Sequence, residues 1–302
     1  MPICQNFYQT LAPCPVVELR GYAAAKGLKG HLYAYLDFNG PTGTARDGLA
    51  EGMLALAIEE KRLSPGQPII EAGSGAFATA LTLAGLTAGY PVVLVMPEDA
   101  PALRQENLLR LGAQILHSPA RSGLAGARTM AQQTAAQNGW YYMDWLANDH
   151  NPEYHRRVTG PGILRAIARE KASLVDAITI GVGSAGTVTG VGETIKAWTN
   201  DVRIVAVEPF ECQALTGGVT GAHNIPDIGY GIVPKNFNSY VVDNVAAVTS
   251  RDAQRAAQLV LRTDAIPAST SAGAALHAAA RLVSNGISRS ALAVFSGRTS
   301  LL

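Results

Sequence analysis

The stretch GVGSAGTVTGVG, residues 181–192, decides the fold class of this 302-residue chain. It begins at the end of an apolar run at 177–183 and leads into a helix-like segment. Its first six residues fit the pattern G-x-G-x-x-G, and Glu208 follows at roughly the spacing of a ribose-binding acid. The pattern alone indicates a dinucleotide site. However, glycines and hydroxyls at a helix N-terminus can hold any phosphate, and a turn that only permits tight packing is the structural alternative.

Apolar runs alternate with helix-like segments along the chain. Further runs lie at 68–73, 91–98, 113–119, 203–209 and 291–297. Continuous apolar strands separated by helices predict an α/β fold with parallel sheets covered by helices on both faces. Ligands of such folds bind where strand ends lead into helices, so the Gly-, Ser- and Thr-rich loops are the candidate sites. These loops are 39–48, 73–79, 181–190 and 269–274.

The composition excludes several classes of protein. Hydrophobic residues make up 48% of the chain and charged residues 16%, which favours a large core over disorder. A formal net charge of +1 predicts no nucleic-acid partner, and no apolar run has the roughly 18 residues that span a membrane. The N-terminus lacks the pattern of a signal peptide. Cys4, Cys14 and Cys212 have no disulfide or zinc spacing, so we expect a cytoplasmic protein with reduced thiols.

Segments along nearly the whole chain resemble the cysteine synthase family of fold-type II pyridoxal-phosphate enzymes. Besides the glycine-rich loop, they lie at 10–21, 59–75, 89–115, 151–163, 205–209, 229–236 and 269–275. The resemblance implies two parallel-sheet α/β domains with the ligand cleft between them. The small substrate-binding domain would span 37–146, and the large cofactor-binding domain 1–36 plus 147–302. A homodimer and pyridoxal 5'-phosphate as cofactor are also implied.

The glycine-rich loop resembles the phosphate cup of that family, in which backbone N–H groups and hydroxyls hold the cofactor phosphate. The corresponding residues here are Gly183, Ser184, Ala185, Gly186 and Thr187. Ala185 replaces a glycine, which we expect to be a modest change because a backbone donor needs no side chain. Ser271 aligns with the hydroxyl that hydrogen-bonds the pyridine nitrogen.

The segment PTGTARDG, residues 41–48, is similar to the family's lysine-bearing segment, and Arg46 stands at the lysine position. The family's lysine forms a Schiff base with the cofactor and later moves the substrate's α-proton. A guanidinium stays protonated at ordinary pH, so Arg46 is neither a Schiff-base nucleophile nor an easy proton shuttle. No other lysine falls in a ligand loop. The lysines are Lys26, Lys29, Lys61, Lys171, Lys196 and Lys235.

The substrate side of the expected site has changed as well. The resemblance assigns substrate binding to Thr44, Ser74, Gly75, Ala76, Phe77, Thr79, Asp144 and Gly229. Ala76 replaces an asparagine, and Phe77 fills space where a small polar residue is expected. Asp144 replaces a glutamine, and its carboxylate would repel a substrate carboxylate. Several altered substrate motifs beside a preserved cup favour natural divergence over an engineered loss of the lysine.

Two further features have a structural interpretation. His155 lies in the segment that resembles the family's interdomain motif, and we expect a structural role for it. The aromatic residues Trp140, Tyr141, Tyr142 and Trp145 are typical of core or interface packing, with a wall of the ligand cleft as the alternative. The histidines show no metal spacing.

Three functions remain open. The first is a cysteine-synthase-like protein with a non-classical, amino-acid-related activity, which binds pyridoxal phosphate or its adduct with an amino acid noncovalently. If active, it would be a lyase or transferase of β-elimination or β-replacement ancestry. The second is an inactive pseudoenzyme that acts through a protein partner. The third is an enzyme that uses no pyridoxal phosphate and acts on an anionic small molecule. A dinucleotide-dependent dehydrogenase has only the glycine pattern in its favour.

Overall fold

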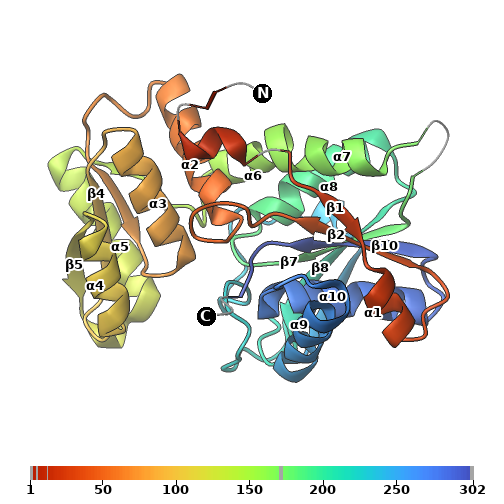
Figure 1. The fold of residues 1–302 in the computed structure, drawn as a ribbon. Coiled ribbons are helices and arrows are strands. Elements are labelled where there is room, and N and C mark those ends of the chain that lie inside the picture. The colour runs from red at the N-terminus through yellow and green to blue at the C-terminus, as the bar shows by residue number, and fades with distance from the viewer. Residues whose placement is uncertain (1–2, 5, 12, 170–172, 300–302) are drawn as a thin grey trace.

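Two β-sheets, one in each lobe of the molecule, organise the fold (Figure 1). The computed structural model describes residues 3–4, 6–11, 13–169 and 173–299. The larger lobe has a six-stranded sheet in which β1 pairs antiparallel with β2 and all other neighbours are parallel. Its strands, in spatial order, are β1 (Val16–Glu18), β2 (His31–Leu36), β10 (Ser290–Phe295), β7 (Ala177–Gly181), β8 (Arg203–Pro209) and β9 (Asn244–Val248).

Helices cover both faces of the larger sheet (Figure 1). One face packs against α1 (Arg20–Ala25), α9 (Ser250–Asp264) and α10 (Thr270–Ser284). The other packs against α7 (Gly160–Ile167) and α8 (Gly186–Trp198). Thr249 and Ser269 cap α9 and α10, because each side chain accepts a hydrogen bond from a first-turn backbone N–H. Polar caps and apolar inner faces therefore fix where these helices begin and how they lie.

The smaller lobe is a wholly parallel, four-stranded sheet. Its strands, in spatial order, are β5 (Gln114–Ser118), β4 (Val92–Pro97), β3 (Ile69–Ala72) and β6 (Tyr141–Tyr142). Residues of α2 (Arg46–Glu59), α3 (Ala76–Thr87) and α4 (Ala102–Arg110) pack on one face. The other face is covered by α5 (Gly123–Asn138), whose buried alanines pack against the sheet. Short 3₁₀ helices lie at Phe7–Thr10, Ala120–Ser122 and Ser239–Val241.

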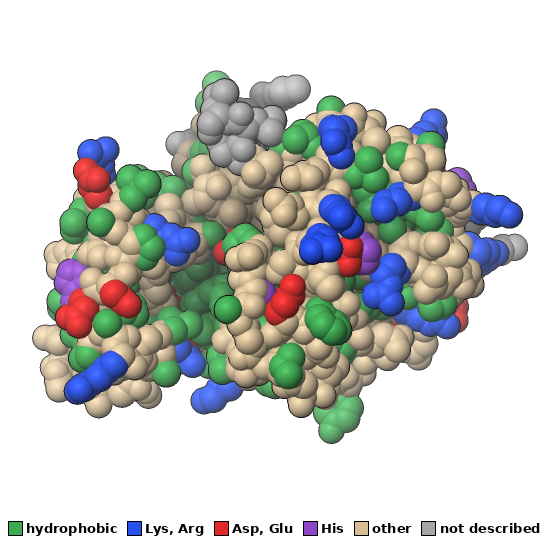
Figure 2. Space-filling view, turned by 90° about the horizontal axis from the view of Figure 1, so that it is seen from below, with side chains coloured by type: hydrophobic (Ala, Val, Ile, Leu, Met, Phe, Trp, Pro, Cys, Tyr) green, Lys and Arg blue, Asp and Glu red, His purple; other side chains and the backbone are tan. Residues whose placement is uncertain are grey.

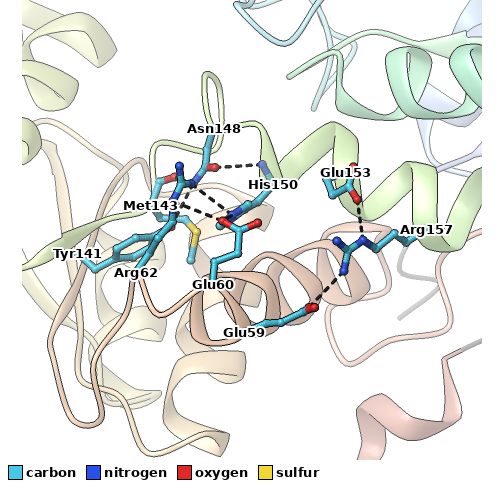
Figure 3. A network of polar contacts seen from close by, with 9 residues as sticks. All are labelled: Glu59, Glu60, Arg62, Tyr141, Met143, Asn148, His150, Glu153 and Arg157. Carbon is cyan, nitrogen blue, oxygen red and sulfur yellow. Dashed lines mark hydrogen bonds and ion pairs between the residues drawn. The ribbon is translucent and has the colours of Figure 1, made fainter.

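The lobes are joined by α6 (His150–Tyr154) and a π-helical turn at His155–Thr159, which pack against α8 and reach back to α2. A network of polar contacts ties the C-terminal end of α2 to this junction (Figure 3). His150 Nε2 lies 2.8 Å from the Glu60 carboxylate, and Arg157 pairs with Glu59 at 3.2 Å. Since α2 packs with the smaller lobe, the network holds the two lobes in one orientation.

The prediction of two parallel α/β domains is confirmed, and each apolar run singled out in the sequence contains a strand. The short strands β1 and β6, and also β2 and β9, were not among those runs. The domain limits at 37 and 146 stay a prediction. They lie just after β2 of one sheet and just after β6 of the other. In the described part of the chain, no helix is long and apolar enough to cross a bilayer.

Close packing of α8 on the junction gives a stability prediction. A Cβ at Gly190 would meet the Pro152 carbonyl oxygen and the His155 side chain. We expect Gly190→Ala to lower the free energy of unfolding by about 1–3 kcal/mol, because the backbone of the junction must shift. Chemical denaturation measures the change. Gly75→Ala is the control, since a Cβ there has no neighbour within 4 Å, and an equal loss in both variants would contradict the packing argument.

Candidate functional site

The phosphate cup is built where β7 leads into α8. Gly183, Ser184, Ala185 and Gly186 form the turn, and the first N–H groups of α8 point out of the helix N-terminus. A Cβ at Gly183 would collide with the Asp227 carbonyl, and one at Gly186 with the side chain of Asn151. Glycine is therefore required at both positions. Free N–H groups and the helix dipole favour an anion here.

Ala185 has a left-handed backbone conformation, with φ 67° and ψ −5°. Glycine adopts this conformation without strain, whereas a residue with a Cβ loses about 1–2 kcal/mol. The expectation of a modest change at this position was therefore wrong. The backbone N–H is kept, but at a cost in strain that the sequence did not reveal.

Hydroxyl groups of the cup are held by buried partners. Asn151 Nδ2 donates to Ser184 Oγ at 3.0 Å, and Thr187 Oγ1 lies 3.1 Å from His155 Nε2. The other ring nitrogen of His155 lies 2.8 Å from Thr159 Oγ1. Burial, helped by the nearby Arg46 charge, lowers the pKa of His155 to about 3. His155 is thus a neutral hydrogen-bonding link between the cup and the interdomain turn, which agrees with the structural role expected for it.

Arg46 is the first residue of α2, and it lines the same cavity as the cup. Its Nη2 donates to the Asp227 carbonyl at 3.0 Å, and its Nη1 lies 3.4 Å from the Ser296 carbonyl. The residue is 8% exposed and forms no ion pair within the described residues. A cation at a helix N-terminus also opposes the helix dipole. Arg46 also donates a hydrogen bond to the Tyr230 hydroxyl. The site therefore contains a buried positive charge whose hydrogen-bond partners are neutral groups.

The space between Arg46 and the cup is small. Arg46, His155, Ser184 and Thr187 help to line a cavity of about 20 Å³. One water molecule needs about 10–15 Å³ on this measure. The donors fit the phosphate of pyridoxal phosphate, but its ring has no room in this arrangement unless the Arg46 side chain moves.

The substrate loop borders a larger, open hollow of about 620 Å³, and Figure 2 shows the surface hollowed between the two lobes. Predicted substrate residues that line it are Ser74, Gly75, Ala76, Phe77 and Thr79. Phe77 stacks on Trp145 with ring centroids 4.6 Å apart, and Tyr230 meets Trp145 edge-on at 6.1 Å. Phe77 and Trp145 are buried, so the aromatic residues pack together and also form a wall of the hollow.

Four predicted site residues lie elsewhere. The Asp144 carboxylate pairs with Arg128 at 2.6 Å and lines neither cavity, so its repulsion of a substrate carboxylate stays a prediction. Gly229 has φ 68°, and its N–H donates to Val182. Ser271 is buried with its hydroxyl 2.9 Å from Ser269 Oγ, and neither Ser271 nor Gly229 lines these cavities. Thr44 borders a different cavity.

Sequence reasoning missed several residues of the site. Asp227 and Ser296 act through backbone carbonyls, which no residue type signals. Tyr230 lies in the segment 229–236 that carries the family resemblance, so that signal was available. Asn151 was missed although it begins the segment 151–163, and its Oδ1 is buried without a hydrogen-bond partner.

Glu71 lies beneath the substrate loop and is 2% exposed. Its Oε1 accepts from the Ala72 N–H at 2.6 Å, and its Oε2 accepts from the Trp145 N–H at 3.0 Å. The carboxyl group thus joins the start of the substrate loop to the interdomain segment. Burial raises the pKa of Glu71 to about 8, against the opposing effect of the two backbone donors.

The fold and the cup together define a two-domain parallel α/β protein with a glycine-rich turn at a helix N-terminus in the interdomain cleft. The family model of pyridoxal-phosphate dependent enzymes matches residues 8–297. Cysteine synthase of Staphylococcus aureus (strain Mu50 / ATCC 700699) is 31% identical over 274 residues, which are 91% of this chain and 87% of that protein. The chain therefore belongs to the pyridoxal-phosphate dependent enzyme family, with cysteine synthases among its relatives.

Solved structures agree with this assignment. Cysteine synthase from Entamoeba histolytica has a TM-score of 0.90 and 28% identity, with 98% of this chain and 88% of that chain covered. O-ureido-L-serine synthase has a TM-score of 0.91 and 26% identity, with 98% and 92% covered. A structure of a lysine-to-alanine mutant of that synthase with O-ureido-L-serine bound has a TM-score of 0.88.

The strain at Ala185 can be tested directly. We expect Ala185→Gly to raise the free energy of unfolding by up to about 1 kcal/mol, because relief of the left-handed strain outweighs the added freedom of the unfolded chain. Chemical denaturation measures the change. Ala127→Gly, in the buried face of α5, is the control and should lower stability by about 1 kcal/mol. Loss of stability in Ala185→Gly would contradict the strain argument.

The raised pKa of Glu71 predicts that the stability of the protein depends on pH. Its pKa is raised on folding, so the folded state holds more protons than the unfolded state between pH 4.5 and about 8. Stability from this group is present below that window and is lost as the pH rises through it, at up to about 1.4 kcal/mol per pH unit. We expect Glu71→Gln to flatten the slope of unfolding free energy over this range. Glu106→Gln, on an exposed part of α4, is the control. An unchanged slope in Glu71→Gln would contradict the prediction.

Proposed function

We propose that this protein is a non-classical member of the cysteine synthase group that binds pyridoxal phosphate, or its adduct with an amino acid, without a covalent bond. Arg46 stands where the family resemblance places the Schiff-base lysine, and a guanidinium cannot take over that chemistry. The phosphate would lie in the cup between Gly183 and Thr187, where it would receive backbone N–H groups of α8 and two hydroxyls. Arg46 would supply the opposite charge.

The observation that carries this proposal is the buried Arg46 guanidinium beside a complete anion cup. Arg46 and the cup residues Ser184 and Thr187 line one cavity, so an anion in the cup would lie next to a cation that has no ion pair. Burying an unpaired charge is costly, and a bound anion offsets that cost. Two neighbouring features that each attract an anion favour a shared ligand over a decayed site.

When bound, pyridoxal phosphate supplies an electron sink for a substrate amino acid. The chain's own residues would orient the ligand rather than react with it. Arg46 would hold an anionic group bidentately, and His155, neutral and buried, would keep the Thr187 hydroxyl in place. The mutant relative with a bound amino acid supports this proposal, because loss of one lysine leaves that synthase able to hold its ligand.

A second candidate is a ligand smaller than pyridoxal phosphate, in an enzyme that does not use this cofactor. The cavity of about 20 Å³ favours this alternative, because it admits a compact anion more readily than a pyridine ring. Inorganic phosphate or a small phosphate ester would then occupy the cup. The cup and Arg46 would have the same roles in both cases. A homodimer, as the family resemblance implies, is proposed for either function.

Arg46→Lys tests the proposal. We expect the unaltered protein to bind pyridoxal phosphate in equilibrium dialysis and to release it on denaturation, even after borohydride treatment. Arg46→Lys should instead retain the cofactor covalently after borohydride, seen as a mass increase in denaturing mass spectrometry, because an amine at this position reaches the aldehyde. Arg128→Lys, which lies at the Asp144 ion pair away from the cup, is the matched control and should gain no covalent cofactor.

Binding measurements with pyridoxal phosphate and with inorganic phosphate separate the two candidate functions. If pyridoxal phosphate does not bind and inorganic phosphate does, the smaller ligand is correct. Thr187→Val should then weaken phosphate binding by about 10-fold, because one hydrogen bond to a charged group is lost. Failure of both ligands to bind would overturn both candidates and would leave a role through a protein partner.

A further inference from the structure

A second cavity lies on the other side of the segment that carries Arg46. Ala45, Arg46 and Leu49 face the cavity at the cup, whereas Thr44 and Asp47 face the second cavity. Its volume is about 130 Å³, which is room for several water molecules or one small organic ligand. It is lined by residues from the N-terminal segment, the loop after β2, the first turn of α2 and the junction with α7.

Acidic groups form the inner part of this second cavity. Asp47 is 1% exposed, and its Oδ2 accepts from the Thr42 N–H at 3.0 Å and the Thr42 hydroxyl at 2.8 Å. Its Oδ1 is buried and has no hydrogen-bond partner among the described residues. Asp37 also lines the cavity, and its carboxylate is 3.6 Å from the Cys14 thiol. A buried acceptor without a partner carries a desolvation cost that a donor in the cavity would remove.

Basic groups lie at the exposed end of the same cavity. Arg157 and Arg165 both line it, and both are exposed. Arg157 is already engaged, because it pairs with Glu153 and Glu59 (Figure 3). Arg165 makes no ion pair among the described residues, so its guanidinium is available to a ligand. The cavity is therefore acidic inside and basic at its mouth.

We propose that this cavity is a second ligand site, separate from the cleft, that binds a small amino acid as its zwitterion. The ammonium group would donate to Asp47 Oδ1 and to Asp37, and the carboxylate would lie at Arg165. The hydroxyls of Tyr35 and Tyr154, which also line the cavity, offer further polar contacts. An ammonium fits because it has three donors and no acceptor, which matches a carboxylate-lined interior.

Two observations favour this ligand over others. Burial raises the pKa of Asp37 to about 6 and also raises that of Asp47, so burial disfavours charge on both groups, whereas a bound cation would favour it. A metal ion is not favoured, because the described residues hold no group of three His, Cys, Asp or Glu side chains with metal-binding geometry. A simple amine would leave Arg165 without its anionic partner.

A ligand bound in this second cavity could affect the position of Arg46 in the cleft, because one backbone segment borders both cavities. Thr44 Oγ1 accepts from the Arg46 N–H at 3.3 Å, and Asp47 is the next residue in the first turn of α2. A ligand that forms a hydrogen bond with Asp47 would therefore contact the same helical turn that positions Arg46. The proposal does not rest on the identity of the ligand in the cleft, and it stands if the proposed function fails.

Calorimetric titration of the full chain with glycine, L-serine, methylammonium and acetate tests the proposal. We expect glycine or L-serine to bind, and we expect the binding to be weakened at least about 10-fold by Arg165→Gln and by Asp47→Asn. Arg165 is exposed, so its variant keeps the fold even if Asp47→Asn disturbs the Thr42 turn. Arg169→Gln, an exposed arginine that does not line the cavity, is the matched control.

The outcomes separate this site from the cleft. Ser184→Ala alters the cup and should leave this binding unchanged. Amino-acid binding that is lost in Ser184→Ala and kept in Arg165→Gln would overturn the second site, because the amino acid would then occupy the cleft. If methylammonium bound as tightly as the amino acids, the ligand would not have to be a zwitterion, and that part of the proposal would be overturned. If neither amino acid gave a heat of binding, the whole proposal would be overturned.

Discussion

The geometry of the cleft depends on how the Arg46 guanidinium is held between the two lobes. Arg46 belongs to α2, which packs with the smaller sheet, and it donates to carbonyls of Asp227 and Ser296 in segments of the larger lobe. The backbone supports the same link, since the Ala45 N–H donates to the Ser296 carbonyl at 2.9 Å and the Arg298 N–H to Gly43 at 2.9 Å. The segment before α2 is thereby fixed to the end of β10. Movement of this arginine would change the cup and the lobe interface together.

Carbonyl partners do not fully offset the charge of a buried cation. Arg46 lowers the pKa of His155, together with burial, and it lowers the pKa of Asp37 against the larger effect of burial. Its charge therefore reaches the cup on one side and the second cavity on the other. A single residue couples two cavities whose ligands would have different charges. This coupling follows from the position of Arg46 in the first turn of α2, where neighbouring side chains point about 100° apart around the helix axis. Arg46 and Asp47 therefore line different cavities.

The sequence was sufficient for the fold and for the family, but not for the geometry of the candidate site. Buried parallel strands such as β4 and β8 are continuous apolar runs, and this signal is strong because both faces are covered by helices. The edge strand β1 and the two-residue β6 lack such runs, since few of their side chains are buried. Within the site, the strain at Ala185 is a property of φ and ψ. The neutralisation of Asp144 depends on Arg128, which lies 16 positions earlier on another element. Neither property is visible in a local motif.

The departures from the family pattern have a common physical direction. By the resemblance, Phe77 would replace a small polar residue, and in the structure it forms a buried aromatic stack with Trp145. Arg46 would likewise replace a group that can lose its proton with one that cannot. Yet the cup kept both of its hydroxyls, its required glycines and its free N–H groups, and it tolerates left-handed strain at Ala185. Strain of this kind persists only where the surrounding structure enforces it. Packing accounts for the glycines, because a Cβ at Gly183 or Gly186 would collide with its neighbours. It does not account for free N–H groups beside a buried guanidinium without an ion pair, and this combination is what the proposed anion would use.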